Sequence, residues 1–327
     1  MNVRQAIVFG GAGFIGSHLV KSLVQSKAYE RVVSVDIVSP RFSVDGVEYT
    51  THDVRTHIPP ELSHGQPTDI FNLAAVHVTP GHPDWQYFDT NVRGAIEVCR
   101  FANATGSRNI VFTSSISVYG PTENPLTESD VLAPTSAYGR SKAAAEGIHT
   151  LWQSEDADRR RLTIARPAVI YGLQERGNFT RLARLLGKGA FIYPGRTDTI
   201  KSCGYVADLV SSIRYMSSRC DGVTIYNFCF EDRYTISDIC NAFCSVTDYR
   251  IPHLRIPVWL LNLAVLPFEM LHRIGIETGI NRERIKKLYF STNILPKRLV
   301  DSGFKFNHDL AGSLQEWKQS SRVQAFD

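Results

Sequence analysis

The sequence Gly10-Gly11-Ala12-Gly13-Phe14-Ile15-Gly16 separates two segments of different hydrophobic pattern. Before it, Ala6-Ile7-Val8-Phe9 is continuously apolar, which is typical of a central parallel strand covered on both faces. After it, apolar residues recur at helical spacing through Leu19 and Leu23. The glycines therefore lie where a buried strand turns into a helix.

Each glycine of this Gly-x-x-Gly-x-x-Gly pattern has an expected role in binding a dinucleotide. Gly10 permits the tight turn, Gly13 lets the backbone approach a pyrophosphate, and Gly16 lets the helix pack closely on the strand. The phosphate would meet the N-terminus of the helix, where unpaired N–H groups and the positive end of the dipole favour an anion. We expect Phe14 and Ile15, which open this helix, to contribute to the same cofactor site.

A carboxylate follows the glycines at the spacing expected for a ribose contact. Arg31-Val32-Val33-Ser34-Val35-Asp36 predicts a second strand that ends in Asp36. An acid about twenty residues after the glycines can bind the ribose 2′-OH of NAD and repels the 2′-phosphate of NADP. A solvated loop acid is the alternative for Asp36, and Arg41 nearby leaves NADP open. The strand–turn–helix context favours NAD.

The composition predicts an ordinary globular protein. The chain has 327 residues, a net charge of +4 and no long run of Lys or Arg, so we expect no nucleic-acid partner. Six cysteines without Cys-x-x-Cys spacing predict reduced thiols and a cytoplasmic protein, and no signal peptide precedes the first strand. The most apolar run, residues 257–271, is broken by Asn262, Pro267 and Glu269 and is shorter than the roughly 20 residues of a membrane span. We expect it to form a buried or interfacial helix.

Strand-like and helical segments alternate through the first half of the chain. This alternation predicts an α/β fold with a Rossmann-type doubly wound parallel sheet. Residues 121–134, which contain three prolines, are predicted to form a loop. Strands are predicted at 47–49, 69–75, 109–113, 162–166 and 225–228, and helices at 84–105, 136–155, 179–187 and 207–217.

Two segments after predicted strands suit the cofactor. Asp53 and Val54 are placed to flank an adenine, although a polar turn explains them equally well. Leu73-Ala74-Ala75 closes another strand with small residues, which leave room for a cofactor at the crevice of an open α/β sheet.

The alternation weakens beyond Tyr171-Gly172. We therefore expect residues 1–173 to form an NAD-binding domain onto which residues 201–230 pack back. Residues 174–327 are expected to form a smaller, mostly helical lobe that binds the substrate.

A set of short motifs is spread in order over most of the chain. It consists of Gly10-x-x-Gly13-x-x-Gly16, Asp36, Asn72-Leu73-Ala74-Ala75, Ser115, Tyr138-x-x-x-Lys142, Arg166-Pro167-Ala168-Val169-Ile170-Tyr171-Gly172 and Tyr205-Val206-Ala207-Asp208. Together these motifs resemble an extended short-chain dehydrogenase/reductase of the NAD-dependent epimerase/dehydratase type.

The resemblance implies a catalytic triad. Tyr138 would take the proton of an alcohol, Lys142 would stabilise the phenolate and hold the ribose, and Ser115 would hydrogen-bond to the substrate oxygen. A phenol with a pKa of about 10 is a poor base at neutral pH. A Lys⁺ one helical turn away and the positive nicotinamide ring are expected to lower that pKa. Without the resemblance, Tyr138 and Lys142 would be an ordinary pair on an exposed helix face.

The residues after the catalytic serine narrow the reaction. The resemblance assigns the serine to Ser115, with Ser114 as the alternative. Sugar 4,6-dehydratases of the family carry an Asp-Glu pair where this chain has Ile116 and Ser117, and its decarboxylases place a Glu at the position of Ser117. Neither acid is present, so the expected reaction needs only a hydride and one proton, as in 4-epimerisation or 4-keto reduction of a nucleotide sugar.

The second lobe supplies the expected contacts to the substrate. Asn178 resembles a residue of the family that contacts the diphosphate, and Lys201 stands where many relatives have a diphosphate-binding Arg. Lys carries the charge without the bidentate fork of Arg. Arg282 and Arg284 are further candidate cations, with a surface helix as the alternative explanation.

An NAD-dependent nucleotide-sugar 4-epimerase is therefore the leading hypothesis, and a 4-keto reductase is the nearest alternative. The apolar run of residues 257–271 also fits a hydroxysteroid-dehydrogenase-like pocket for a hydrophobic alcohol, and a dinucleotide-sensing binding module is a non-enzymatic alternative. The resemblance further implies a possible homodimer through the helices at 84–105 and 136–155, although both helices could pack within one monomer.

Overall fold

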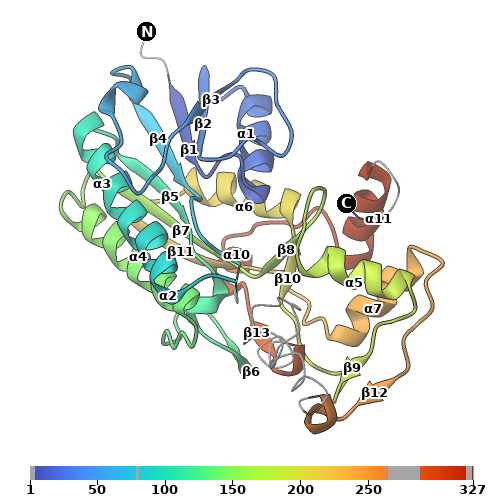
Figure 1. The fold of residues 1–327 in the computed structure, drawn as a ribbon. Helices are drawn as coiled ribbons and strands as arrows, with labels where there is room; N and C mark the ends of the chain where they lie inside the picture. Colours follow the sequence, from blue (N-terminus) through green and yellow to red (C-terminus); the bar gives the residue numbers. More distant parts are fainter. Residues whose placement is uncertain (1–3, 79–80, 262, 264–287, 322–325, 327) are drawn as a thin grey trace.

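The computed structural model describes residues 4–78, 81–261, 263, 288–321 and 326 (Figure 1). A seven-stranded sheet with the strand order β11-β7-β5-β4-β1-β2-β3 forms its centre, and every neighbouring pair is parallel. The predicted doubly wound parallel sheet is confirmed. The strands are β1 (Gln5–Phe9), β2 (Arg31–Asp36), β3 (Val47–Thr51), β4 (Thr68–Asn72), β5 (Asn109–Thr113), β7 (Arg161–Pro167) and β11 (Val223–Phe228).

The direction in which the sheet grows reverses at β1. The chain proceeds outward from β1 to β2 and β3 on one side, and from β4 through β5 and β7 to β11 on the other. In an open α/β sheet, the crevice at the carboxyl ends of the strands beside such a reversal is where ligands bind. The glycine turn begins directly after Phe9, at the carboxyl end of β1.

Helices cover both faces of the sheet, and alternate side chains of β1 show how. Ala6 and Val8 pack in the cluster that holds α1 (Phe14–Ser26) and α6 (Val206–Ser217). Ile7 and Phe9 point the other way, toward α3 (Gly94–Thr105) and α4 (Ala137–Ser154). Figure 1 shows these two helix layers on either side of the strands. This two-sided burial explains why the strands are continuously apolar.

Three pairs of short parallel strands and a separate aromatic core lie outside the seven-stranded sheet, in a region that is called the second lobe below. Tyr171 stacks on Phe179 with ring centroids 4.2 Å apart, and Phe243 and Trp317 complete a buried aromatic cluster. The strand pairs are β8 (Val169–Tyr171) with β10 (Cys203–Tyr205), β9 (Tyr193–Pro194) with β12 (Arg255–Ile256), and β6 (Thr122–Leu126) with β13 (Thr292–Ile294). The helices are α5 (Asn178–Gly187), α7 (Ile236–Ser245), α10 (Lys297–Asp301) and α11 (Leu310–Ser320).

Two predicted elements differ from the structure. The predicted loop at 121–134 contains β6. Its partner strand β13 lies far along the chain, so no local sequence pattern predicts the pairing. The predicted helix at 84–105 is divided into α2 (Asp84–Phe88), a π-helical turn (Asp89–Arg93) and α3. No helix among the described residues is long and apolar enough to cross a bilayer. Much of the apolar run at 257–271 lies outside the described residues.

A buried ion pair joins α4 to the sheet. Arg166 of β7 donates to both carboxylate oxygens of Glu146 of α4, at 2.9 and 2.6 Å. Arg166 also donates to the hydroxyl of Tyr119 at 2.6 Å, and this hydroxyl donates to Asn227 of β11 at 2.9 Å. Both charged side chains are less than one-tenth exposed. The charges therefore depend on each other, because neither has water to replace its partner.

We expect Glu146→Ala to lower the free energy of unfolding by about 3–5 kcal/mol, because it leaves the buried Arg166 charge unpaired. Asp156→Ala removes the exposed pair with Arg159 and should change it by less than about 1 kcal/mol. Urea unfolding of both variants and the parent measures the difference. Equal losses in the two variants would contradict a special role for the buried pair.

Candidate active site

The glycine turn brings backbone from three elements into close contact. Gly10 has φ +78°, and a Cβ at this position would lie 2.6 Å from the backbone nitrogen of Ala74. A Cβ on Gly16 would lie 2.2 Å from the carbonyl oxygen of Gly10. Gly13 is the N-cap residue of α1 in an extended conformation. The third glycine thus allows the helix to pack on the turn itself, in addition to the expected contact with the strand.

Asp36 is held against this turn. The backbone N–H of Ala12 donates to one carboxylate oxygen at 3.1 Å, and that of Ile37 donates to the other at 2.7 Å. The side chain is half-buried at the carboxyl end of β2. Because each carboxylate oxygen has further lone pairs, this geometry leaves acceptors for a ribose hydroxyl.

The residues after β4 lie beside the turn as well. Leu73 donates its N–H to the carbonyl of Phe9 at 2.8 Å, and Leu73, Ala74 and Ala75 are all partly exposed. Ala74 faces Gly10 across the close contact described above. These residues border the crevice that the reversal of strand order creates.

Asn91 anchors this border and was missed by the sequence analysis. Its side chain accepts the N–H of Val76 at 2.9 Å and donates to Ser141 of α4 at 2.8 Å. It lies in the π-helical turn that divides the predicted helix, and π-helical turns are frequent at functional sites. One buried amide therefore ties the segment after β4 to the helix that carries Tyr138 and Lys142.

Asp53 and Val54 have partners within the protein. Arg55 donates to both carboxylate oxygens of Asp53, at 2.7–3.0 Å, and lowers the pKa of that carboxyl group. Val54 is buried, with a methyl group close to Gly94 of α3. Their expected contact with an adenine stays a prediction.

The three predicted catalytic residues meet where α4 approaches the segment after β5. The side chain of Tyr138, in the first turn of α4, lies next to that of Ser115, which acts to lower the pKa of the tyrosine. One turn later, the Nζ of Lys142 donates to the carbonyl of Thr113 at 2.8 Å. A Cβ on Gly139 would lie 2.3 Å from the carbonyl oxygen of Ser117, so this glycine lets the helix come close enough for the Tyr138–Ser115 contact.

Burial controls the charges of this group. It raises the pKa of Tyr138 to about 12, although the neighbouring Ser115 side chain opposes the shift. It also lowers the pKa of Lys142 to about 7, opposed by the charge of Glu146. Removing either group from water disfavours its charged form. The expected lowering of the pKa of Tyr138 by Lys142 together with a nicotinamide ring stays a prediction.

The structure distinguishes the two candidate serines. Ser115 accepts the N–H of Ser117 at 3.1 Å and donates to its hydroxyl, also at 3.1 Å, beside Tyr138. The hydroxyl of Ser114 is buried and has no hydrogen-bond partner among the described residues. Ile116 packs in a small apolar cluster. Of the two serines, Ser115 is thus the one that interacts with Tyr138.

The predicted substrate residues of the second lobe lie on separate elements. Asn178 is exposed at the first position of α5. The Nζ of Lys201 donates to the carbonyl of Phe290 at 2.5 Å, and burial lowers the pKa of Lys201 to about 8. Arg282 and Arg284 lie outside the described residues. The roles of these four residues toward a substrate stay predictions.

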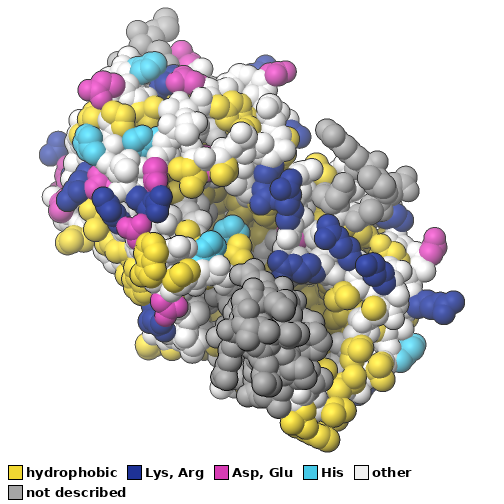
Figure 2. Space-filling view, viewed as in Figure 1, with side chains coloured by type: hydrophobic (Ala, Val, Ile, Leu, Met, Phe, Trp, Pro, Cys, Tyr) yellow, Lys and Arg dark blue, Asp and Glu magenta, His cyan; other side chains and the backbone are white. Residues whose placement is uncertain are grey.

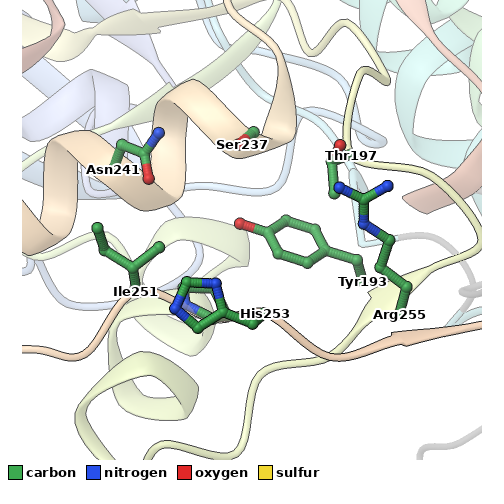
Figure 3. Close-up of a pocket in the computed structure, with 8 residues that line it drawn as sticks. Tyr193, Thr197, Ser237, Asn241, Ile251, His253 and Arg255 are labelled. Atoms are coloured by element: carbon green, nitrogen blue, oxygen red, sulfur yellow. The ribbon is translucent and has the colours of Figure 1, made fainter.

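A cavity of about 350 Å³ in the second lobe was not expected (Figure 3). Ser237 and Asn241 of α7 line one side, and His253 and Arg255 line the other, with the ring of Tyr193 between them. The hydroxyl of Tyr193 hydrogen-bonds to Ser237 and to Cys240. The residues that line this cavity come from α7, from β9 and β12 and from the segments beside these strands. The cavity is therefore built by different elements from the triad.

The comparison with protein families agrees with the geometry of the triad. Residues 6–229 match the model of the NAD dependent epimerase/dehydratase family. The chain belongs to this family. The resemblance inferred from the motifs is confirmed, and the matched region holds the glycine turn, Asp36 and the complete triad.

Relatives of the epimerase/dehydratase chain include 4-epimerases. An N-acetyl-alpha-D-glucosaminyl-diphospho-ditrans,octacis-undecaprenol 4-epimerase of Escherichia coli O157:H7 is 27% identical over 321 residues, which cover 98% of this chain and 96% of that protein. A UDP-glucose 4-epimerase of Lacticaseibacillus casei is 37% identical over 149 residues, which cover 43% and 44% of the two chains. The structure of MoeE5 in complex with UDP-glucuronic acid and NAD has a TM-score of 0.75 at 23% identity and covers 96% of this chain and 99% of that chain.

The epimerase/dehydratase family depends on NAD, and the residues of this chain fit that cofactor. Gly13 precedes α1 as its N-cap residue, and Cβ atoms on Gly10 and Gly16 would collide with backbone. Asp36 offers carboxylate acceptors beside the turn. A dinucleotide with its pyrophosphate at the start of α1 and a ribose at Asp36 would use both features.

Substituting two helical glycines by alanine tests whether the close packing of α1 on the glycine turn is needed for NAD binding. We expect Gly16→Ala to weaken NAD binding about tenfold to a hundredfold, because the added methyl group would push α1 away from Gly10. Gly147→Ala, in α4 where a Cβ meets no atom within 4 Å, should leave binding unchanged and stabilise the chain by about 0.5–1 kcal/mol. Calorimetric titration with NAD measures the first effect, and thermal unfolding measures the second. Unchanged NAD affinity in Gly16→Ala would refute the proposed position of the pyrophosphate.

The lowered pKa of Lys142 predicts how stability depends on pH. Between about 7 and the ordinary value of 10.5, the unfolded chain binds this proton more strongly than the folded chain. The free energy of unfolding should therefore rise with pH in this window, by up to about 1.4 kcal/mol per pH unit.

In Lys142→Met this contribution should be absent, so the difference between parent and variant should change across the window. Lys297→Met is the control, because Asp301 raises the pKa of this exposed lysine. Urea unfolding at several pH values provides the measurement. Parallel curves for the parent and Lys142→Met would show that Lys142 stays charged in the folded chain.

Proposed function

We propose that this chain is an NAD-dependent 4-epimerase of a nucleotide sugar that acts by transient oxidation at C4. The observation that carries the proposal is the Ser115–Tyr138 pair with Lys142 one turn away, at the same carboxyl edge of the parallel sheet as the glycine turn. The full-length relative and the UDP-glucose 4-epimerases support the reaction type.

The proposed mechanism gives each residue one task. Ser115 would hold the 4-oxygen of the sugar by a hydrogen bond, and Tyr138 would exchange the proton of that hydroxyl. Lys142, fixed by the carbonyl of Thr113, would in its protonated form favour the phenolate form of Tyr138. NAD, when bound, supplies the acceptor and then the donor of the hydride at C4. Rotation of the 4-keto sugar between the two transfers would invert the centre.

Two other reactions of the family are disfavoured. The positions that hold acids in its dehydratases and decarboxylases carry Ile116 and Ser117. Neither side chain has a carboxyl group that could eliminate water or assist loss of CO₂. Ile116 is buried, and Ser117 accepts a hydrogen bond from Ser115. A 4-keto reductase would use the same triad in one direction and would consume NADH. A hydrophobic alcohol remains the alternative substrate if sugar diphosphates do not bind.

A lipid-linked sugar diphosphate is a second candidate substrate. The relative that matches 98% of this chain acts, by its name, on a saccharide joined through a diphosphate to undecaprenol. The UDP-glucose 4-epimerases of Lacticaseibacillus casei and Vibrio cholerae match 43% and 57% of the chain. Both substrate types share the sugar and the diphosphate, for which Asn178, Lys201 and Arg282 are the proposed contacts.

The domain division, cellular location and assembly complete the proposal. We infer that residues 1–173, with 201–230, bind the cofactor, and that residues 174–327 bind the substrate. The six cysteines are all free, which supports a reduced, cytoplasmic protein. A homodimer would bury the exposed apolar side chains of the helices at 84–105 and 136–155, among them Trp85 and Leu151, which are 61% and 64% exposed.

The decisive variant is Tyr138→Phe. We expect it to lower kcat by about a hundredfold to ten-thousandfold and to leave NAD affinity unchanged, because it removes only the proton-exchanging hydroxyl. The assay supplies NAD with UDP-, GDP- and dTDP-sugars and with a polyprenyl-diphosphate sugar, and follows the sugar epimers by chromatography. Tyr215→Phe is the control, because its hydroxyl donates to Ser302 from α6, away from the triad.

The parent should interconvert epimers of one substrate class without net formation or consumption of NADH. Stoichiometric consumption of added NADH would replace the epimerase with the reductase. Full activity of Tyr138→Phe would refute the role of the tyrosine.

A further inference from the structure

Helix α5 presents a cationic face outside the active site. Phe179, Leu182, Ala183 and Leu186 are buried in the core of the second lobe. On the opposite side, residues at helical spacing line a shallow groove of about 270 Å³. They are Arg181, Arg184, Leu185 and Lys188, and all four are exposed.

Three cations of this face lie without a carboxylate partner. Within the described part of the chain, Arg181, Arg184 and Lys188 have no carboxylate within ion-pair distance. Arg93 and Arg159, by contrast, form ion pairs with carboxylates on neighbouring turns. Figure 2 shows a band of positive side chains over α5. Their charge is therefore available to an anionic partner.

Exposed apolar side chains border the cationic face. Ile192 precedes β9 and Leu254 precedes β12; the parallel register of these strands places the two residues side by side. They are 36% and 56% exposed. Trp259 and Leu260, just after β12, are 64% and 44% exposed. Figure 2 shows apolar side chains below α5, over the region of β9 and β12.

We propose that this surface, composed of Arg181, Arg184, Leu185, Lys188, Ile192, Leu254, Trp259 and Leu260, docks on an anionic lipid bilayer. Unpaired Lys and Arg side chains attract anionic headgroups, and their aliphatic stems can lie along the apolar boundary. A Trp and aliphatic side chains beside the cations are the composition of a helix that lies in the membrane interface. A nucleic acid would satisfy the charges but would leave the exposed aliphatic side chains without an apolar partner. The proposal does not depend on the reaction proposed above.

The experiment is sedimentation of the full chain with vesicles. One set contains phosphatidylcholine with phosphatidylglycerol, and the other contains phosphatidylcholine alone. We expect binding to the anionic vesicles that weakens as salt is added. The triple variant Arg181→Gln, Arg184→Gln, Lys188→Gln should bind about a hundredfold more weakly, because each cation contributes about a factor of five. Trp259→Ala should lose several-fold in affinity.

The matched control removes three exposed cations elsewhere: Arg93→Gln, Arg159→Gln, Lys297→Gln. These side chains are 59%, 65% and 61% exposed, and the change in net charge is the same. The control should bind like the parent, and an unchanged thermal midpoint would show that both variants are folded. An equal loss of vesicle binding in the two triple variants would show that binding depends only on net charge, which would overturn the proposal. The proposal would also be overturned if the parent did not bind to the vesicles. The same holds if the parent formed only crosslinked copies of itself and did not bind to vesicles.

Discussion

The close approach of backbone at the glycine turn is the constraint on which the site depends. Gly10 faces Ala74 and Gly16 at distances that leave no room for a Cβ, so β1, α1 and the segment after β4 converge without side chains between them. The same convergence brings Asp36 against the turn through the N–H of Ala12. The reversal of strand order explains the position of the crevice. The turn places the start of α1, whose first N–H groups have no partner within the helix, at the carboxyl end of β1.

Helix α4 imposes the second constraint, because it buries charge in order to place the triad. Lys142 is almost inaccessible to water, and the next turn of the same face carries Glu146, which Arg166 neutralises. Gly139 allows the contact with the segment that holds Ser115. Burial raises the pKa of Tyr138 and lowers that of Lys142, so the neutral form of each group is favoured. A positive charge that enters the site would lower both pKa values.

The second lobe differs from the sheet in how it uses its surface. Its aromatic core is closed around Tyr171 and Phe179, whereas the outer side of α5 and the strands beside it expose cations and apolar side chains together. The proposed catalytic triad and the proposed membrane-docking surface on α5 use different elements, so one chain can carry both. The family match covers the triad, whereas the docking surface is argued from the α5 residues of this chain.

The sequence by itself determined what depends on local pattern. It predicted the strands of the sheet, the glycine turn, the carboxylate at Asp36 and the spacing of Tyr138 and Lys142, because periodicity and turn chemistry are encoded by neighbouring residues. Only the tertiary structure decided the pairing of β6 with β13 and the π-helical turn that positions Asn91. The same is true of the Glu146–Arg166–Tyr119 network and the direction of the pKa shifts of Tyr138 and Lys142. These features arise from contacts between distant residues and from burial, which no local pattern specifies.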